Sequence, residues 1–289
     1  MSTAAESSTQ RLFPYERWSS NLDTLAEQYR SAQPYPHIHL VDFLNDDVMQ
    51  SVVDAFPKPG DTNWTNYKHY NENKLGKNDR NQFPSAIGEL IDELNSDPFV
   101  EWLSKITSIE GLMADPMLEG GGMHQTERGG FLNIHADFTM HHYHKNWHRR
   151  CNLIIYLNDG WQESWGGTIE LWDQSMTRCV AKTPPLMNHA LIFSTTDTSF
   201  HGYSEPLQCP QSETRKSLAL YYYTHQTDPT YSPKSTNYKP IPSDGRLKSL
   251  GIWLDKTVLA IYTRVKTTLG LPDNFASWVL GLFSRKKKP

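Results

Sequence analysis

The sequence predicts a mostly β protein with flanking helices, whose central part is a β-sandwich or a β-barrel. Two observations lead to this fold class. From about residue 120, short apolar runs alternate with glycine and proline turn signals at 120–122, 129–130, 166–167 and 184–185. Short strands at this spacing are typical of sandwiches and barrels. Before and after this region, apolar residues recur at helical spacing, which predicts the flanking helices.

The N-terminal part is expected to contain one strand and three helices. Residues 1–12 read as a flexible lead-in. The stretch 34–45 begins with prolines and then alternates polar and apolar residues, which predicts a strand. Residues 45–56 have the caps and apolar spacing of a helix, and 85–109 has the pattern of two helices broken near Pro98. The polar stretch 58–81 is expected to be a long loop, and such loops are often functional.

The central part contains six apolar runs that predict strands. They are 131–136, 151–157, 168–172, 178–182, 190–194 and 217–224. A polar, proline-rich linker at 228–245 follows, and the segment 246–283 is helical in pattern and leads into the basic end SRKKKP. We therefore expect a lead-in over 1–32, a β domain with supporting helices over 33–228, and a linker with a C-terminal helical appendage over 229–289.

Composition excludes several classes of protein. The 289 residues carry a formal net charge of −4, whereas sequence-independent nucleic-acid binding depends on neutralising phosphates. Three cysteines and no CxxC pair argue against a disulfide framework or a zinc ribbon, and indicate a reducing, cytoplasmic location. The N-terminal MSTAAESSTQ lacks an apolar core, and no uncharged apolar run reaches about 18 residues, so we expect no signal peptide and no transmembrane helix.

A metal site is indicated by the short motif HAD. Residues two apart in a strand point to the same face, so His135 and Asp137 converge. His201, at the turn after the predicted strand HALIFST, is a candidate third ligand. Two imidazoles and one carboxylate on one face of an octahedron leave three positions open. This ligand set suits non-haem Fe(II) that must bind a co-substrate and O₂.

A second motif, RKS at 215–217, indicates what the co-substrate is. A 2-oxo acid would occupy open iron positions, and its far carboxylate would need a fixed cation. Arg215 supplies a guanidinium fork, and Ser217 adds a donor on the same strand face. The alternative is that Arg215 is a surface residue paired with Glu213.

The order HAD…H…RKS resembles the 2-oxoglutarate/Fe(II)-dependent oxygenases, within them the prolyl-hydroxylase-like branch. RRCNLIIYLN (149–158) is similar to the second core strand of that branch, and WGGTIELW (165–172) to its GG-x-L hairpin. NHALIFSTTDTSFHGYSE (188–205) is similar to the strand that delivers the distal histidine, and YPHIHLVDFL (35–44) to the opening strand. The resemblance covers roughly residues 33–225 and implies a double-stranded β-helix, a cupin-like jelly-roll.

The resemblance also implies roles for individual residues. The catalytic iron ligands would be His135, Asp137 and His201, and the 2-oxoglutarate-binding residues would be Arg215, Ser217, Tyr156 and Asn152. The alternative for Tyr156 is that it is an amphipathic core residue that does not contact 2-oxoglutarate. The alternative for Asn152 is that it forms local hydrogen bonds instead of contacting the ligand. Two departures stand out: many members use lysine instead of arginine as the anchor, and 203–214 is longer than in the shortest members.

Four further histidines follow the ligand strand. We expect them to be loop residues at the mouth of the pocket, exposed to solvent, with substrate contact as the alternative; they are His141, His142, His144 and His148. The basic C-terminal tail follows apolar residues between Phe275 and Phe283, a pattern that suits peripheral membrane contact. We favour the alternative, a docked helix with a solvated basic end.

The resemblance implies that the chain is an iron oxygenase that uses Fe(II), 2-oxoglutarate and O₂, with ascorbate as a candidate reductant. It would hydroxylate a C–H bond of a peptidyl residue such as proline, a free amino acid or a small metabolite, and release succinate and CO₂. The alternatives are a desaturase or epoxidase with the same site, a catalytically silent jelly-roll binding module, and a cupin-like metal hydrolase or isomerase without 2-oxoglutarate. Asp137, Arg215 and Ser217, all present, favour the oxygenase.

Overall fold

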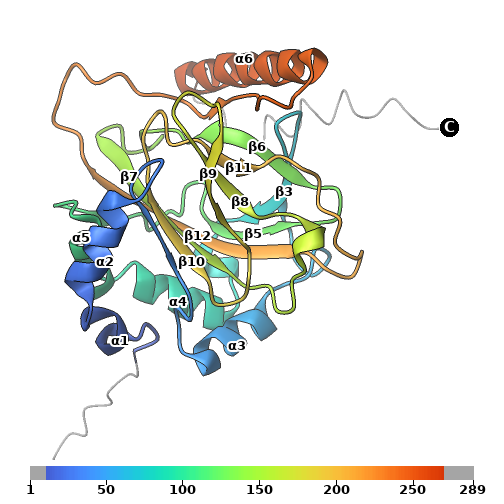
Figure 1. The fold of residues 1–289 in the computed structure, drawn as a ribbon. Coiled ribbons are helices and arrows are strands. Elements are labelled where there is room, and N and C mark those ends of the chain that lie inside the picture. The colour runs from blue at the N-terminus through green and yellow to red at the C-terminus, as the bar shows by residue number, and fades with distance from the viewer. Residues whose placement is uncertain (1–10, 270–289) are drawn as a thin grey trace, which may run out of the picture.

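The computed structural model describes residues 11–269, and its centre is one sheet of thirteen antiparallel strands that curls into a nearly closed barrel (Figure 1). The strands are β1 (His37–Leu40), β2 (Thr65–Lys68), β3 (Glu72–Lys77), β4 (Met113–Ala114), β5 (Gly122–Thr126), β6 (Phe131–Ala136), β7 (Trp147–Tyr156), β8 (Ile169–Trp172), β9 (Cys179–Thr183), β10 (Ala190–Ser194), β11 (His201–Tyr203), β12 (Arg215–His225) and β13 (Asn237–Tyr238). Neighbours follow the order β1-β10-β7-β12-β5-β3-β6-β11-β8-β9. Off this path, β2 pairs with β3, β4 with β12 and β13 with β6. The predicted mostly β jelly-roll is confirmed.

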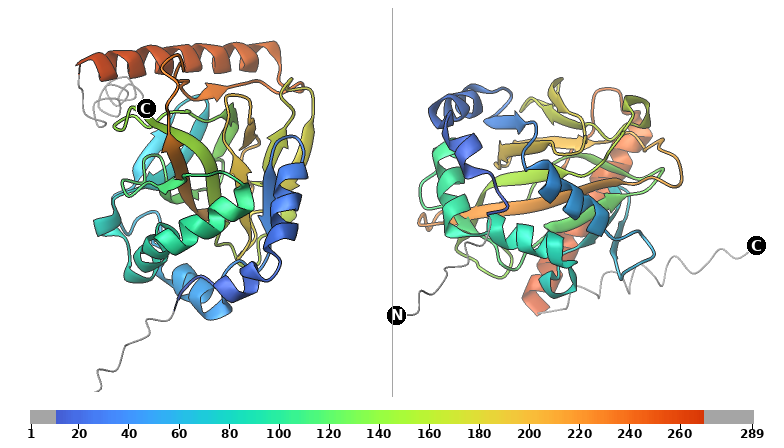
Figure 2. Two further views of the ribbon diagram at one scale, coloured as in Figure 1. Left: turned by 90° about the vertical axis from the view of Figure 1, so that its left-hand side faces the viewer. Right: turned by 90° about the horizontal axis from the view of Figure 1, so that it is seen from below.

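Most of the helices precede the core strands and pack on one side of the barrel (Figures 1 and 2). They are α1 (Tyr15–Ser19), α2 (Leu22–Ser31), α3 (Asp46–Ala55), α4 (Ser85–Leu94), α5 (Asp97–Thr107) and, near the end of the chain, α6 (Arg246–Leu269). The helix predicted over 45–56 and the pair predicted over 85–109 are confirmed. Pro98 lies in the first turn of α5, where a missing N–H leaves no intrahelical bond unmade.

The hydrophobic core lies between these helices and the outer face of the barrel. On β7, Leu153 and Ile155 point outward into this core, together with residues of β10, β12 and the helices. The alternate residues of the same strand, Ile154 and Tyr156, point into the barrel. Both faces of this part of β7 are therefore buried, which explains the continuous apolar run over residues 153–156.

The long loop predicted over 58–81 is wrong, because β2 and β3 form a hairpin there and β3 pairs with β5 and β6. Charged residues hid this strand from sequence patterning. The Lys74 ammonium lies 3.2 Å from a Glu72 carboxylate oxygen, and Lys77 donates to the Asn63 carbonyl oxygen at 2.9 Å. Each buried charge is thus satisfied by a tertiary contact, so polar residues are tolerated on this strand.

The segment after β12 returns to the barrel instead of leaving it. Asn237 and Tyr238 of β13 pair with β6, and α6 lies along the barrel beside them (Figure 1). The helix predicted over 246–283 is present over 246–269, and the apolar and basic residues after Leu269 lie outside the described residues. Within residues 11–269, none of the helices is long and apolar enough to span a bilayer.

Candidate metal and co-substrate site

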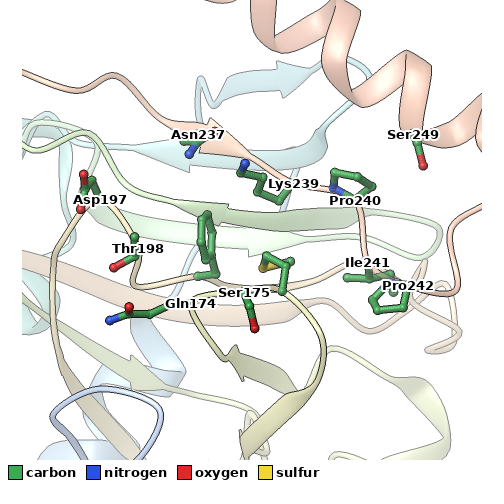
Figure 3. Close-up of a pocket in the computed structure, with 12 residues that line it drawn as sticks. Gln174, Ser175, Asp197, Thr198, Asn237, Lys239, Pro240, Ile241, Pro242 and Ser249 are labelled. Atoms are coloured by element: carbon green, nitrogen blue, oxygen red, sulfur yellow. The ribbon is translucent and has the colours of Figure 1, made fainter.

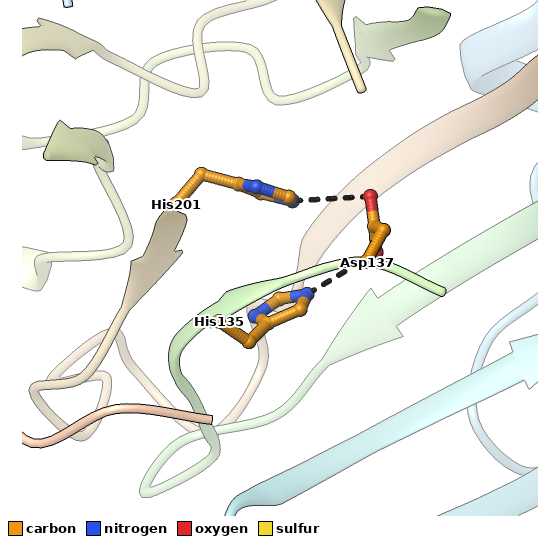
Figure 4. A group of neighbouring side chains, drawn as sticks. All are labelled: His135, Asp137 and His201. Carbon is orange, nitrogen blue, oxygen red and sulfur yellow. Dashed lines mark ion pairs between the residues drawn. The ribbon is translucent and has the colours of Figure 1, made fainter. Parts of the chain in front are cut away.

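Three predicted ligands meet inside the barrel, close to one end of β6. His135 is on β6, Asp137 follows this strand directly, and His201 begins β11, which pairs with β6 so that His201 lies opposite His135. One ligand atom from each residue lies within 4.8 Å of the others, and all three side chains are buried (Figure 4). Strand pairing therefore brings together residues that are far apart in the chain.

Both imidazoles are oriented so that their Nε2 atoms face the space beside Asp137 in which a metal ion would lie. His135 Nδ1 hydrogen-bonds to the Asn133 carbonyl oxygen at 2.9 Å, and His201 Nδ1 to the Ser199 carbonyl oxygen at 3.0 Å. A carbonyl oxygen only accepts, so each Nδ1 carries a proton, and in the neutral ring Nε2 then keeps its lone pair for a metal ion. The two Nε2 atoms lie 3.4 and 3.6 Å from the Asp137 carboxylate oxygens.

The protonation states at this site suit a divalent metal ion. Burial lowers the pKa of His201 to about 4, so its imidazole is neutral at pH 7. Burial by itself would raise the pKa of Asp137, but the neighbouring Arg149 guanidinium together with His201 and His135 outweighs it and holds this pKa well below the usual range. Two imidazoles and one carboxylate are the donor set that non-haem Fe(II) takes, so the residues fit this ion.

Asp137 is held by two donors that come from β7. Arg149 Nη2 donates to Asp137 Oδ2 at 3.0 Å, and Asn152 Nδ2 donates to the same oxygen at 2.8 Å. Asn152 also accepts from Arg149 Nε at 2.8 Å and from the Thr195 hydroxyl at 3.2 Å. These contacts place Asn152 beside the metal ligands, and its predicted contact with 2-oxoglutarate stays a prediction.

Arg149 is a site residue that sequence reasoning missed. Its side chain is fully buried, and its guanidinium carbon lies 3.4 Å from the centre of the Tyr221 ring. Strict alternation along β7 would turn residue 149 away from Asn152. The pairing of β7 with β12 skips Arg150, however, and this bulge turns Arg149 inward. The pair RR at 149–150 was the one signal, and it does not say which arginine points inward.

The predicted co-substrate residues line the barrel interior on two neighbouring strands, β7 and β12. Ser217 lies opposite Tyr156 of β7 on one side and His124 of β5 on the other, so these side chains share a face. Arg215 is two residues along β12 on this face, and its guanidinium carbon lies 4.2 Å from the Tyr203 ring centre and 5.0 Å from that of Tyr156. Arg215 is buried, and its Nε donates to the Gly167 carbonyl oxygen at 2.7 Å.

The Tyr156 hydroxyl supports a ligand in this pocket. It is buried and has no hydrogen-bond partner within the described part of the chain. Burial raises the pKa of Tyr156 to about 12, so the hydroxyl keeps its proton and remains a donor. An unpaired buried hydroxyl is costly unless a ligand completes it. A carboxylate between Arg215, Ser217 and Tyr156 would do so, which fits the far carboxylate of 2-oxoglutarate.

Further residues reach the same interior from segments where no site was predicted. Gly76 of β3 lies opposite His124, so Lys74, two residues earlier, shares the interior face with it. Tyr238 of β13 lies opposite His135, and the centres of their rings are 5.2 Å apart. Sequence patterning offered no signal for them, because β3 and β13 gain their place through pairing with β5 and β6.

The prediction of exposed loop histidines is wrong for His141 and partly wrong for His148. His141 is buried, and its ring nitrogens lie 3.4 Å from Asp115 and 3.2 Å from Glu119. The carboxylates of Asp115 and Glu119 therefore fix the position of His141 at the start of the loop. His148 belongs to β7 and is half-buried, whereas His142 is exposed as expected and His144 is half-buried.

A separate pocket of about 670 Å³ lies on the outer side of β6, β8 and β11, under the segment that contains β13 (Figure 3). Its lining includes Met176, Phe200 and Lys239. Phe200 packs with Ile134 and Ala136 on the outer face, whereas His201 and His135 point inward. The strands therefore separate this pocket from the metal ligands.

Comparison with known proteins agrees with the geometry. The family model of the 2OG-Fe(II) oxygenase superfamily matches residues 121–223, which include the three ligands, Arg215 and Ser217. The chain is 25% identical over 248 residues to prolyl 3-hydroxylase OGFOD1 of Xenopus laevis, covering 81% of this chain and 44% of that protein. It is 27% identical over 200 residues to the Mus musculus protein of the same name, covering 67% and 33%. The chain thus spans less than half the length of these relatives.

Solved structures show the same fold. A prolyl-4-hydroxylase of Pseudomonas putida matches with a TM-score of 0.51 at 14% identity, covering 71% of this chain and 100% of that one. A prolyl hydroxylase of Trichoplax adhaerens, in complex with a peptide fragment of hypoxia inducible factor, matches with a TM-score of 0.51 at 14% identity, covering 74% and 94%. Residues 121–223 therefore match the 2OG-Fe(II) oxygenase superfamily in sequence, and the chain shares the fold of these two prolyl hydroxylase structures.

Proposed function

We propose that this chain is a 2-oxoglutarate- and O₂-dependent iron oxygenase that hydroxylates a prolyl residue of a peptide. The observation that carries the proposal is the meeting of His135, Asp137 and His201 in the interior that also holds Arg215. The family match supports the activity, and the prolyl hydroxylases among the similar proteins support the substrate class.

The chain's own residues would divide the work in two. On one side, His135, Asp137 and His201 would hold ferrous iron, with Asp137 kept ionised and oriented by its buried donors. On the other side, the Arg215 guanidinium and the hydroxyls of Ser217 and Tyr156 would hold the far carboxylate of 2-oxoglutarate. When bound together, iron, 2-oxoglutarate and O₂ supply oxidative decarboxylation to succinate and CO₂, coupled to oxidation of a substrate C–H bond.

The residues around this site line the interior with charged and aromatic side chains that a substrate would contact. Glu72 and Lys74 form an ion pair at 3.2 Å on the interior face of β3, and Lys74 also lies over the Tyr67 ring at 5.6 Å from its centre. Tyr238 adds an aromatic wall against His135. An aromatic and polar lining of this kind suits a peptide segment better than a wholly apolar metabolite.

The test is succinate release by the purified chain with Fe(II), 2-oxoglutarate and a panel of proline-containing peptides, with the peptides analysed by mass spectrometry. We expect peptide-dependent succinate release and the gain of one oxygen on a prolyl residue. Asp137→Ala should reduce peptide-dependent succinate release to background. Asp54→Ala, which removes an exposed carboxylate on α3, should leave it unchanged.

Three outcomes would contradict different parts of the proposal. Unchanged succinate release by folded Asp137→Ala would refute the ligand assignment. Succinate release with free amino acids but with none of the peptides would keep the oxygenase and reject the peptidyl substrate. The absence of a visible charge-transfer band on anaerobic addition of Fe(II) and 2-oxoglutarate would favour the binding-module alternative, since keto-acid chelation needs open positions.

A further inference from the structure

Helix α6 presents an apolar stripe to solvent. Of the nine exposed large hydrophobic side chains among the described residues, five lie on this helix. They are Leu247 (85% exposed), Leu250 (52%), Trp253 (57%), Leu254 (49%) and Val258 (62%). Four of them follow a spacing of three, four and four residues, which keeps them on one face of a helix. Exposed apolar patches of this kind mark interaction surfaces.

The orientation of the stripe is set by polar contacts on the opposite face of the helix. The Asp255 carboxylate lies 2.8 Å from His69 Nδ1 and accepts from Asn71 Nδ2 at 2.6 Å. Lys256 donates to the Asn237 side-chain oxygen at 2.6 Å. The helix thus turns Asp255 and Lys256 toward the barrel, and the apolar stripe points away from it.

Close packing supports this orientation. Tyr70, in the β2–β3 turn, lies against Gly251, where an added Cβ would come within 2.2 Å of the tyrosine ring. Ile252 is buried, and it belongs to one apolar cluster with Tyr238 and Leu132 of the barrel. In Figure 1 and the left view of Figure 2, α6 lies at the edge of the described part of the chain, and no other helix or strand lies beyond it. The stripe is therefore left uncovered by the described part of the chain.

Charge is distributed unevenly between this end of the chain and the rest. Residues 246–289 contain nine Lys and Arg and two Asp, a formal charge of +7, whereas residues 1–245 carry 19 Lys and Arg against 30 Asp and Glu, a charge of −11. The apolar spacing of α6 continues in the sequence at Ile261, Val265 and Leu269, with the same steps of three, four and four. An apolar stripe within a basic segment is typical of helices that lie on a membrane surface.

We propose that α6 docks the protein on an anionic lipid surface, with the stripe in the headgroup region and the basic residues of 246–289 near the lipid phosphates. A second copy of this chain fits the stripe less well, because two segments of charge +7 would be brought together. An acidic bilayer matches this charge, and each Lys or Arg near such a surface is worth about 1 kcal/mol, roughly a fivefold change in affinity.

The experiment is co-sedimentation of the full chain with vesicles of phosphatidylcholine alone and of phosphatidylcholine mixed with phosphatidylglycerol. We expect at least about tenfold stronger binding to the anionic vesicles, weakened by added salt. The variant Leu250→Ser/Leu254→Ser/Val258→Ser should lose this binding. It should keep the thermal stability and succinate release of the unmodified chain, because these side chains are exposed and none of them belongs to the metal or co-substrate site.

The matched control is the variant Val41→Ser/Met117→Ser, which removes two exposed hydrophobic side chains outside α6. Val41 is 48% exposed and Met117 is 45% exposed. This control should bind anionic vesicles like the unmodified chain. Equal binding to both kinds of vesicle, or full binding by the triple variant, would overturn the proposal. Failure to bind either kind of vesicle would also overturn the proposal. If light scattering then shows a dimer that the triple variant breaks, the stripe binds a second copy of the chain instead.

Discussion

At the residue scale, Arg149 decides how the metal ligand Asp137 behaves. The guanidinium is buried between the Phe138 and Tyr221 rings, at 4.7 and 3.4 Å from their centres, and its Nη2 bonds to the carboxylate. A buried carboxylate without this partner would be an uncompensated charge. Arg149 is therefore a positioning residue, since it acts on the metal through Asp137 and Asn152.

Arg149→Met should lower the free energy of unfolding by about 3–5 kcal/mol, the usual effect of removing one partner of a buried ion pair. Urea denaturation of the metal-free protein at pH 7 measures this change. Arg150→Met is the control, because Arg150 is half-buried and donates to the Thr224 hydroxyl at 3.3 Å, so its loss should cost at most about 1 kcal/mol. Equal losses for the two variants would show that the contact with Asp137 is not special.

At the element scale, the turn before β8 positions the co-substrate anchor. Gly166 and Gly167 both have positive φ, 75° and 76°. An added Cβ at Gly167 would come within 2.8 Å of Arg215 Cδ and 2.8 Å of Leu207 Cδ2, whereas none of the surrounding atoms lies within 4 Å of one at Gly166. The second glycine of the GG hairpin is thus required for close approach of Arg215, as well as for its own backbone conformation.

Gly167→Ala should raise the KM for 2-oxoglutarate, because the added methyl group displaces the Arg215 side chain. Loss of a buried charged contact costs about 2 kcal/mol or more, so a KM increase of roughly 30-fold is expected. Gly166→Ala is the control, because it introduces the same backbone strain at a positive φ. It should lower the free energy of unfolding by about 1–3 kcal/mol and leave the KM for 2-oxoglutarate unchanged. Steady-state succinate kinetics with varied 2-oxoglutarate separate the two variants, and a similar KM for both would contradict the packing argument.

At the scale of the whole molecule, His69 joins the C-terminal helix to the barrel. Its two ring nitrogens lie 2.8 Å from Asp255 of α6 and 2.8 Å from Glu72 of β3. Burial by itself would lower the pKa of His69, but its hydrogen bonds to these two carboxylates outweigh it and raise the pKa to about 9. The protonated ring therefore holds α6 against the β2–β3 hairpin at neutral pH.

Attachment of α6 should weaken as the pH rises. A histidine with a raised folded-state pKa contributes stability that is complete below its unfolded pKa of about 6.5 and is lost as the pH rises through about 9. Hydrogen exchange of the α6 amides should accordingly accelerate between pH 7 and 9, beyond the intrinsic effect of pH. His69→Gln should exchange faster at pH 7 and show no further loss. A wild-type protection factor that stays constant over this range would contradict the assignment.

Local patterning was sufficient for much of this protein. Alternation and turn signals predicted the core strands over 131–136, 151–157 and 190–194, and the motifs HAD and RKS identified residues that the structure brings into one interior. These features are defined by the spacing of residues two to four positions apart. Such short-range periodicity can be recognised from the sequence without knowledge of the fold.

Tertiary structure alone decided the rest, because the deciding contacts join distant segments. The charged strand β3 exists because β5 and β6 pair with it, and Arg149 points inward because β7 bulges against β12. The sequence of α6 shows that an apolar stripe is present, whereas its outward direction follows from the bond between Asp255 and His69. A periodic pattern defines the faces of an element, but only the partners that fold against it select which face is buried.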